Sequence, residues 1–150
     1  GSLDKTMFGK GSLDQANPRR SIYLTVKRSN LIPILQLFDA PDSIQSIGHR
    51  DVTTVPPQAL ALMNSPLTRQ LAEKFAKRIY ASGETTMEQV VNQAYILALS
   101  RFPTESEKTQ MIGFITAQGI SYGNTDKSGS QAVVDYCQLM LCLNEFLFID

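Results

Sequence analysis

The stretch SQAVVDYCQLMLCLNEFLF, residues 130–148, decides the fold class that we expect for this chain. Its apolar side chains recur three and four residues apart, which is the spacing of one face of an α-helix. They are Val133, Tyr136, Cys137, Met140 and Leu141, and Leu139, Leu143 and Phe146 make the segment apolar nearly all round. A helix with that distribution is buried on most sides, so we predict one helix from about Ser130 to Phe148 at the centre of the core.

An amphipathic helix is expected to begin at Pro66. Ser65 is a favoured N-cap residue, and proline at the first helical position has no N–H group to leave unsatisfied. Leu67, Leu71, Phe75 and Ile79 follow at a spacing of four residues. The pattern predicts that these four side chains face the core and that the helix ends at Gly83.

Two further helix starts are marked by capping boxes, in which a threonine and an acidic residue three positions later satisfy exposed N–H groups. Thr85 with Glu88 predicts one start, and Thr104 with Glu107 predicts the next. Apolar stripes follow both starts. They consist of Met87, Val90, Val91, Ala94 and Ala98 in the first helix and of Met111, Ile112 and Ile115 in the second.

The first third of the chain has no comparable pattern. Residues 1–17 are rich in Gly, Ser, Asp and Asn and are expected to form a flexible N-terminal segment or the remnant of a tag. Residues 21–26 alternate in the manner of a strand, and a short two-stranded pairing with residues 51–55 is the alternative to irregular chain. Short helices are expected over residues 31–38 and 58–63.

These patterns predict an all-α domain over residues 18–150, a bundle of four main helices with an irregular N-terminal third. Fourteen basic residues balance fourteen acidic ones, so there is no electrostatic footprint for nucleic acid. No apolar run is long enough to span a membrane. Cys137 and Cys142 lie on different sides of one predicted helix and are expected to be free thiols, and the chain lacks a Cys-x-x-Cys-His haem motif.

The densest polar chemistry lies in residues 39–64. Residues 39–57 have no helical or strand period, and a loop of that length inside a compact domain is often functional. The candidate binding residues are Asp39, Asp42, His49, Arg50, Thr54, Gln58 and Asn64.

Two interpretations of Asp39, Asp42 and His49 stay open. In one, they form an acid/base group or ligate a metal. In the other, the two aspartates close turns around Pro41 and His49 lies at the surface. Because a lone histidine without ligand spacing is a weak metal signal, we assign no catalytic and no metal residues. The arginines at positions 19, 20, 28 and 50 likewise either gather around an anion or pair with aspartates.

Several short motifs, taken together and in order, resemble the C-terminal domain of unknown function of large planctomycete proteins that also carry cytochrome-C-like domains. The motifs are Arg19-Arg20-Ser21-Ile22-Tyr23, Phe38-Asp39-Ala40-Pro41-Asp42, Thr53-Thr54-Val55-Pro56-Pro57-Gln58-Ala59-Leu60 with Met63-Asn64, Arg101-Phe102-Pro103-Thr104-Glu105 and Asn144-Glu145-Phe146. Ser100 departs from this pattern, because a glycine is expected before Arg101.

The resemblance implies that the chain is the C-terminal module of an exported or periplasmic multidomain parent. It implies no cofactor in this chain, with any haem held elsewhere in the parent, and it brings no catalytic residues. We therefore expect a non-catalytic binding or scaffolding domain whose partner is either the parent's upstream domains or a surface polymer. The alternative is a carbohydrate-processing or hydrolase-like accessory role that uses the loop with Asp39, Asp42 and His49.

Overall fold

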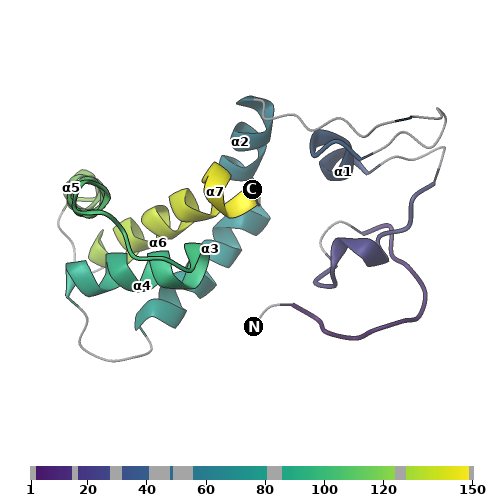
Figure 1. Ribbon diagram of the computed structural model, residues 1–150, viewed down its shortest axis with the longest axis horizontal. Coiled ribbons are helices and arrows are strands. Elements are labelled where there is room, and N and C mark those ends of the chain that lie inside the picture. Colours follow the sequence, from purple (N-terminus) through teal and green to yellow (C-terminus); the bar gives the residue numbers. More distant parts are fainter. Residues whose placement is uncertain are drawn as a thin grey trace. The chain divides into compact units, whose positions relative to one another are not determined.

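The computed structural model describes residues 3–14, 17–27, 32–40, 48, 56–80, 86–123 and 128–148. Over these residues the chain is helical and contains isolated β-bridges but no strand, which confirms the all-α prediction. The chain forms two compact units, residues 1–61 and 62–150, and each is described by itself. Figure 1 shows the elements of both units.

The first unit contains the 3-10 helix η1 (Ser21–Tyr23), the short helix α1 (Pro33–Leu37) and most of α2 (Pro56–Met63). Pro33 opens α1, as expected for a residue whose missing N–H group would be unsatisfied in a first turn. Isolated parallel bridges join Asp4 to Arg19 and Ser12 to Leu24. The N-terminal residues are thus tied to the segment around η1.

The strand predicted over residues 21–26 is wrong for its first half. The Tyr23 N–H donates to the Arg20 carbonyl at 2.9 Å, and the Leu24 N–H donates to the Ser21 carbonyl at 2.9 Å. These local bonds use the donors that a strand would offer to a neighbour, so a 3-10 turn forms instead. The proposed partner, residues 51–55, lies outside the described residues.

The second unit is a bundle of α3 (Pro66–Tyr80), α4 (Met87–Leu99), α5 (Glu105–Ser121), α6 (Ser128–Leu141) and α7 (Asn144–Leu147). Helix α6 packs against each of the other four, and Figure 1 shows it running beside α3. Its core side chains are fully buried, namely Ala132, Val133, Tyr136, Cys137 and Met140. The prediction that this segment is central is therefore confirmed.

The predicted C-terminal helix is nevertheless interrupted. Helix α6 ends at Leu141, and Leu143 takes an extended backbone conformation before α7 begins at Asn144. The Cys142 N–H donates to the Leu139 carbonyl at 3.0 Å, a tight bond three residues back that closes the helix. Helical periodicity continues through this break in the sequence, so periodicity alone did not reveal it.

Helix α3 begins at Pro66 as predicted, but its buried face differs from the predicted stripe. Leu67 and Leu71 are 44% and 38% exposed, whereas the buried residues are Thr68, Ala72, Ala76 and Ile79. Small side chains allow two helices to approach closely, and α6 packs on this alanine face. The helix is described up to Tyr80, and the predicted end at Gly83 lies outside the described residues.

One of the two predicted capping boxes is displaced by a residue. The Thr104 and Glu107 box at the start of α5 is confirmed. At the start of α4 the box is formed by Thr86 and Gln89 rather than by Thr85 and Glu88. Thr86 has the extended backbone of an N-cap, and the Gln89 amide oxygen accepts its N–H at 2.9 Å, so a neutral glutamine replaces the expected acid.

Candidate functional site

Four of the seven predicted binding residues, Asp42, His49, Arg50 and Thr54, lie outside the described residues. The proposed grouping of Asp39, Asp42 and His49 therefore stays a prediction. In the described part of the chain, no three His, Cys, Asp or Glu side chains gather closely enough to hold a metal ion.

The other three predicted residues have distinct local roles. Asp39 lies at the end of α1 with a left-handed backbone (φ 56°), and its N–H donates to the Gln36 carbonyl at 3.1 Å. Gln58 is only 2% exposed, and its Nε2 donates to the Leu37 carbonyl at 2.9 Å. Asn64 is exposed in the turn between α2 and α3. Gln58 thus links α2 to the end of α1.

Arg19 shows how an arginine of the first unit is used. Its guanidinium donates to the carbonyls of Thr6, Phe8 and Lys10 at 3.0, 2.7 and 3.2 Å. It also lies over the Tyr23 ring, with 3.8 Å between the guanidinium carbon and the ring centroid. These contacts bind three backbone groups of the N-terminal segment, so they favour a structural role over anion binding for this arginine.

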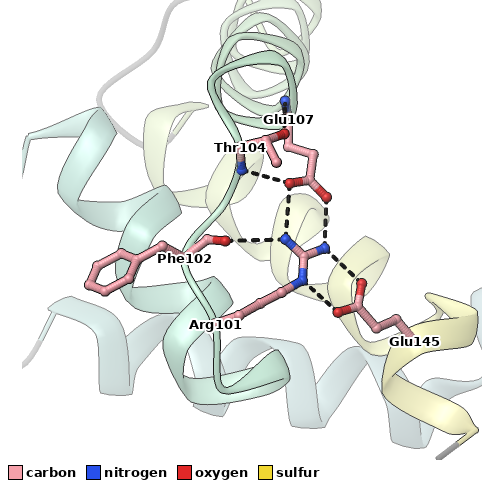
Figure 2. Close-up of polar contacts among 5 residues, drawn as sticks. All are labelled: Arg101, Phe102, Thr104, Glu107 and Glu145. Carbon is pink, nitrogen blue, oxygen red and sulfur yellow. Dashed lines mark hydrogen bonds and ion pairs between the residues drawn. The ribbon is translucent and has the colours of Figure 1, made fainter. Parts of the chain in front are cut away.

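The densest ionic cluster in the described residues joins α5 to α7 through Arg101, and Figure 2 shows it. The Arg101 Nη1 and Nη2 donate to the two Glu107 carboxylate oxygens at 3.0 and 2.7 Å. Its Nε and Nη2 donate to the two Glu145 oxygens at 2.6 and 2.8 Å. Nη1 also donates to the Phe102 carbonyl at 3.1 Å. All the guanidinium nitrogens are therefore engaged within the chain.

This arrangement holds its groups in their charged forms. Hydrogen bonds from Arg101 and from the Thr104 backbone lower the pKa of Glu107 to about 2. Hydrogen bonds from Arg101 also lower the pKa of Glu145, and the two carboxylates raise the pKa of Arg101. A carboxylate that stays ionised and accepts hydrogen bonds at both of its oxygens is unsuited to shuttle protons near neutral pH. We therefore assign the cluster a structural role as a clasp, the Arg101 clasp, between α5 and α7.

The clasp joins two motifs that carried the sequence resemblance, residues 101–105 and 144–146. Their side chains meet although Arg101 and Glu145 are 44 residues apart. Charge complementarity between a lone arginine after one helix and a glutamate near the chain's end was the signal available in the sequence. It could not be interpreted alone, because many such pairs exist in any chain.

A second polar network links α3, α5 and α6. The Asp135 carboxylate accepts from Arg69 at 2.5 Å and from the Tyr122 hydroxyl at 2.7 Å. The Gln138 amide accepts from Arg69 at 3.0 Å and donates to the Met63 carbonyl at 2.7 Å. A cavity of about 320 Å³ lies beside it, lined by Met63, Phe114, Gln118, Asp135, Gln138 and Leu139. Asp135 and Gln138 already form hydrogen bonds within the chain, so they have few hydrogen-bonding groups left for a ligand.

A third feature is a hollow of about 380 Å³ between α3 and α6. It is lined by Glu73, Ala76, Lys77, Tyr80, Ser130, Gln131 and Val134. In the part of the chain that the structure describes, its five polar side chains make no hydrogen bond and no ion pair with the protein. We name this feature the Ala76 hollow, and it is the site with the most unused hydrogen-bonding capacity among the cavities described.

No sequence motif pointed to the Ala76 hollow. Its residues belong to two helices, and Tyr80 and Ser130, the pair from different helices that lies nearest in the sequence, are fifty positions apart. Only the contact between α3 and α6 brings them together.

The cysteines are free, as expected from the sequence. Cys137 is buried in α6, and burial raises the pKa of its thiol to about 12. Burial also raises the pKa of the partly buried Cys142. A neutral thiol is a poor nucleophile, so neither position has the features of a reactive cysteine.

The fold and these sites define a small helical bundle with an apolar core and with ion pairs between its helices. The chain belongs to the PSD1 family, described as "Protein of unknown function (DUF1553)", whose model matches residues 3–115. No curated protein and no solved structure match the chain. None of the helices in the described residues has both the length and the apolar character needed to cross a membrane.

Proposed function

We propose that this chain is a non-catalytic binding or scaffolding module of an exported or periplasmic, multidomain planctomycete protein. Its partner is either the parent's upstream domains or a surface polymer. Family membership supports the coarser part of this proposal, a domain of unknown function. The planctomycete, multidomain and exported context rests on the motif resemblance given above.

One observation carries the choice of binding over catalysis. In the described residues, the densest cluster of ionisable side chains is the Arg101 clasp, and its members are hydrogen-bonded to one another. The Ala76 hollow, by contrast, has open polar groups but no paired acid and base activated by a neighbour. A surface of this kind can hold a ligand without transforming it.

Haem is assigned in this proposal to the parent's cytochrome-C-like domains. The support is the sequence, which contains two cysteines five positions apart and no Cys-x-x-Cys-His motif. The parent would thus separate redox chemistry from binding. A haem-stained gel of the parent and of this chain tests the assignment, because a stained band from this chain alone would contradict it.

Cross-linking mass spectrometry on the intact parent protein tests the scaffolding role. An amine-reactive reagent would modify the exposed Lys74 and Lys77 of α3. We expect reproducible cross-links from these lysines to upstream domains, or cosedimentation of the parent with its cell-surface fraction. Absence of both would contradict the proposal.

A substrate panel tests the absence of catalysis. We expect chromogenic esters, phosphoesters and glycosides to show no turnover above buffer. Turnover that disappears in Asp39→Asn or His49→Ala would overturn the proposal and favour the hydrolase-like alternative.

A further inference from the structure

Resting on the binding role proposed above, we propose that the Ala76 hollow between α3 and α6 binds a short segment of an uncharged polysaccharide. Ala76, whose side chain is short, lines the hollow on its α3 side. Glu73, Lys77 and Tyr80 follow the same side of α3 at spacings of four and three residues and form one rim. Ser130 and Gln131 of α6 form the other rim.

The lining combines an apolar floor with a polar rim. Ala76 and Val134 are buried and supply the floor. Tyr80 is 39% exposed, and its side chain combines an aromatic ring that can pack against a ligand with a hydroxyl group that can hydrogen-bond to it. A pyranose ring has the same division, with C–H groups on its faces and hydroxyl groups around its edge. The hollow therefore matches a sugar ring in the distribution of its chemistry.

The charge of the lining selects among polar ligands. It contains one carboxylate, Glu73, and one ammonium group, Lys77, so its net formal charge is zero. A site for sulfated or phosphorylated polymers is expected to carry a surplus of Arg or Lys. The rim instead offers both donors and acceptors, from a carboxylate, an ammonium group, two hydroxyl groups and an amide. Sugar hydroxyls need both kinds, because each one donates and accepts.

The geometry also favours a saccharide over a peptide. A helical peptide needs a continuous apolar groove, and the rim of this hollow is polar. An extended peptide that binds by strand addition needs the free edge of a sheet, and the described residues contain no strand. The volume of about 380 Å³ lies at the lower end of ligand sites, which suits one or two sugar rings.

The test is a titration of the ¹⁵N-labelled chain with cellohexaose, mannohexaose and xylohexaose, followed by amide NMR spectra. We expect at least one of these neutral oligosaccharides to shift the amides of Lys77, Tyr80, Ser130 and Gln131. Tyr80→Ala should weaken that binding about tenfold, because the ring contact is lost, whereas Tyr80→Phe should retain most of it. Phe102→Ala is the matched control, since it removes an aromatic ring that is 69% exposed and points away from the Arg101 clasp (Figure 2).

Three results would overturn the inference. The first is that no oligosaccharide shifts these amides. The second is that the Tyr80→Ala variant binds the oligosaccharide as tightly as the unsubstituted chain does. The third is that a polyanion such as chondroitin sulfate binds the hollow more tightly than the neutral sugars. Should Tyr80→Ala disturb the fold, Gln131→Ala at an exposed position of the other rim tests the site instead, and it should also weaken the binding because it removes a rim amide.

The outcome is separable from the broader binding role. If the neutral sugars fail but cross-links to upstream domains are found, the saccharide site is wrong and the scaffolding role stands. If binding to a neutral sugar is accompanied by its hydrolysis, the non-catalytic role is wrong although the site is correct.

Discussion

Ser100 ends α4 with a left-handed backbone, φ 57° and ψ 23°. A side chain in this region costs about 1–2 kcal/mol, and glycine avoids that cost. Glycine adopts this conformation without strain, which agrees with the glycine that the motif resemblance led us to expect before Arg101. The presence of serine instead of glycine at position 100 therefore affects the backbone turn that leads into the Arg101 clasp. It does not change any side chain of the candidate sites.

We predict that Ser100→Gly stabilises the protein by about 0.5–1 kcal/mol, since the relief of strain exceeds the extra freedom of glycine in the unfolded chain. Urea denaturation followed by circular dichroism measures the change. Ser106→Gly, inside α5, is the matched control and should lower stability, because there the serine is helical. Equal effects of the two substitutions would contradict this account.

Glu107 gives the clasp a pH dependence. Its pKa in the folded protein is about 2, below the ordinary value of 4.5, so the unfolded chain binds the proton more tightly. The stabilisation from this group is therefore fully present above about pH 4.5 and is lost as the pH falls toward 2. Because the carboxylate is partly exposed, we expect its contribution to be about 1 kcal/mol.

We predict that Glu107→Gln lowers stability at pH 7 and flattens the fall in stability between pH 4.5 and pH 2. Denaturation curves across this range measure both effects. The control is Glu105→Gln, which removes an exposed pair with Lys108 in the same helix and should change stability at pH 7 by less. If both variants keep the same acid profile as the original chain, the clasp does not control it.

At the scale of the helices, caps decide where α4 begins. The sequence pattern favoured Thr85, but Thr86 makes the cap, and the Gln89 N–H donates to its hydroxyl at 3.3 Å. The pattern identified the helix and missed its first residue, because glutamine serves as well as glutamate in a capping box. Helix existence was thus predictable, and its boundary depended on which hydroxyl reached a free N–H group.

We predict that Thr86→Ala destabilises the protein by about 1 kcal/mol, because the Gln89 N–H loses its acceptor. Thermal unfolding measures the loss. Thr116→Ala is the matched control, since the Thr116 hydroxyl bonds back to the Ile112 carbonyl inside α5, and alanine is a better helix former there. That control should be neutral or stabilising, and a loss as large as that of Thr86→Ala would argue against the cap.

At the scale of the helical unit, α6 is the element around which the others pack. It contacts α3, α4, α5 and α7, and Met140 lies fully buried near its end. Truncating a buried side chain removes apolar contact and leaves a void. Stability should therefore be most sensitive to substitutions in α6.

We predict that Met140→Ala costs about 2–5 kcal/mol. Ile120→Ala, at an exposed position of α5, should stay within about 0.5 kcal/mol. Urea denaturation compares the two variants, and hydrogen exchange should find the slowest amides of this unit in α6. Faster exchange in α6 than in α3 or α5 would contradict its central place.

The sequence by itself determined the all-α class, the central place of α6 and the starts of α3 and α5. These features depend on local physics, namely helical periodicity, N-cap hydroxyls and the fixed geometry of proline. The tertiary structure decided the rest. It turned Ala72 and Ala76 of α3 inward in place of Leu67 and Leu71, ended α6 at Leu141, and joined Arg101 to Glu145. It also created the Ala76 hollow. Each of these features depends on the shape and charge of a surface that a segment distant in the sequence contributes. Local sequence patterns cannot predict that surface.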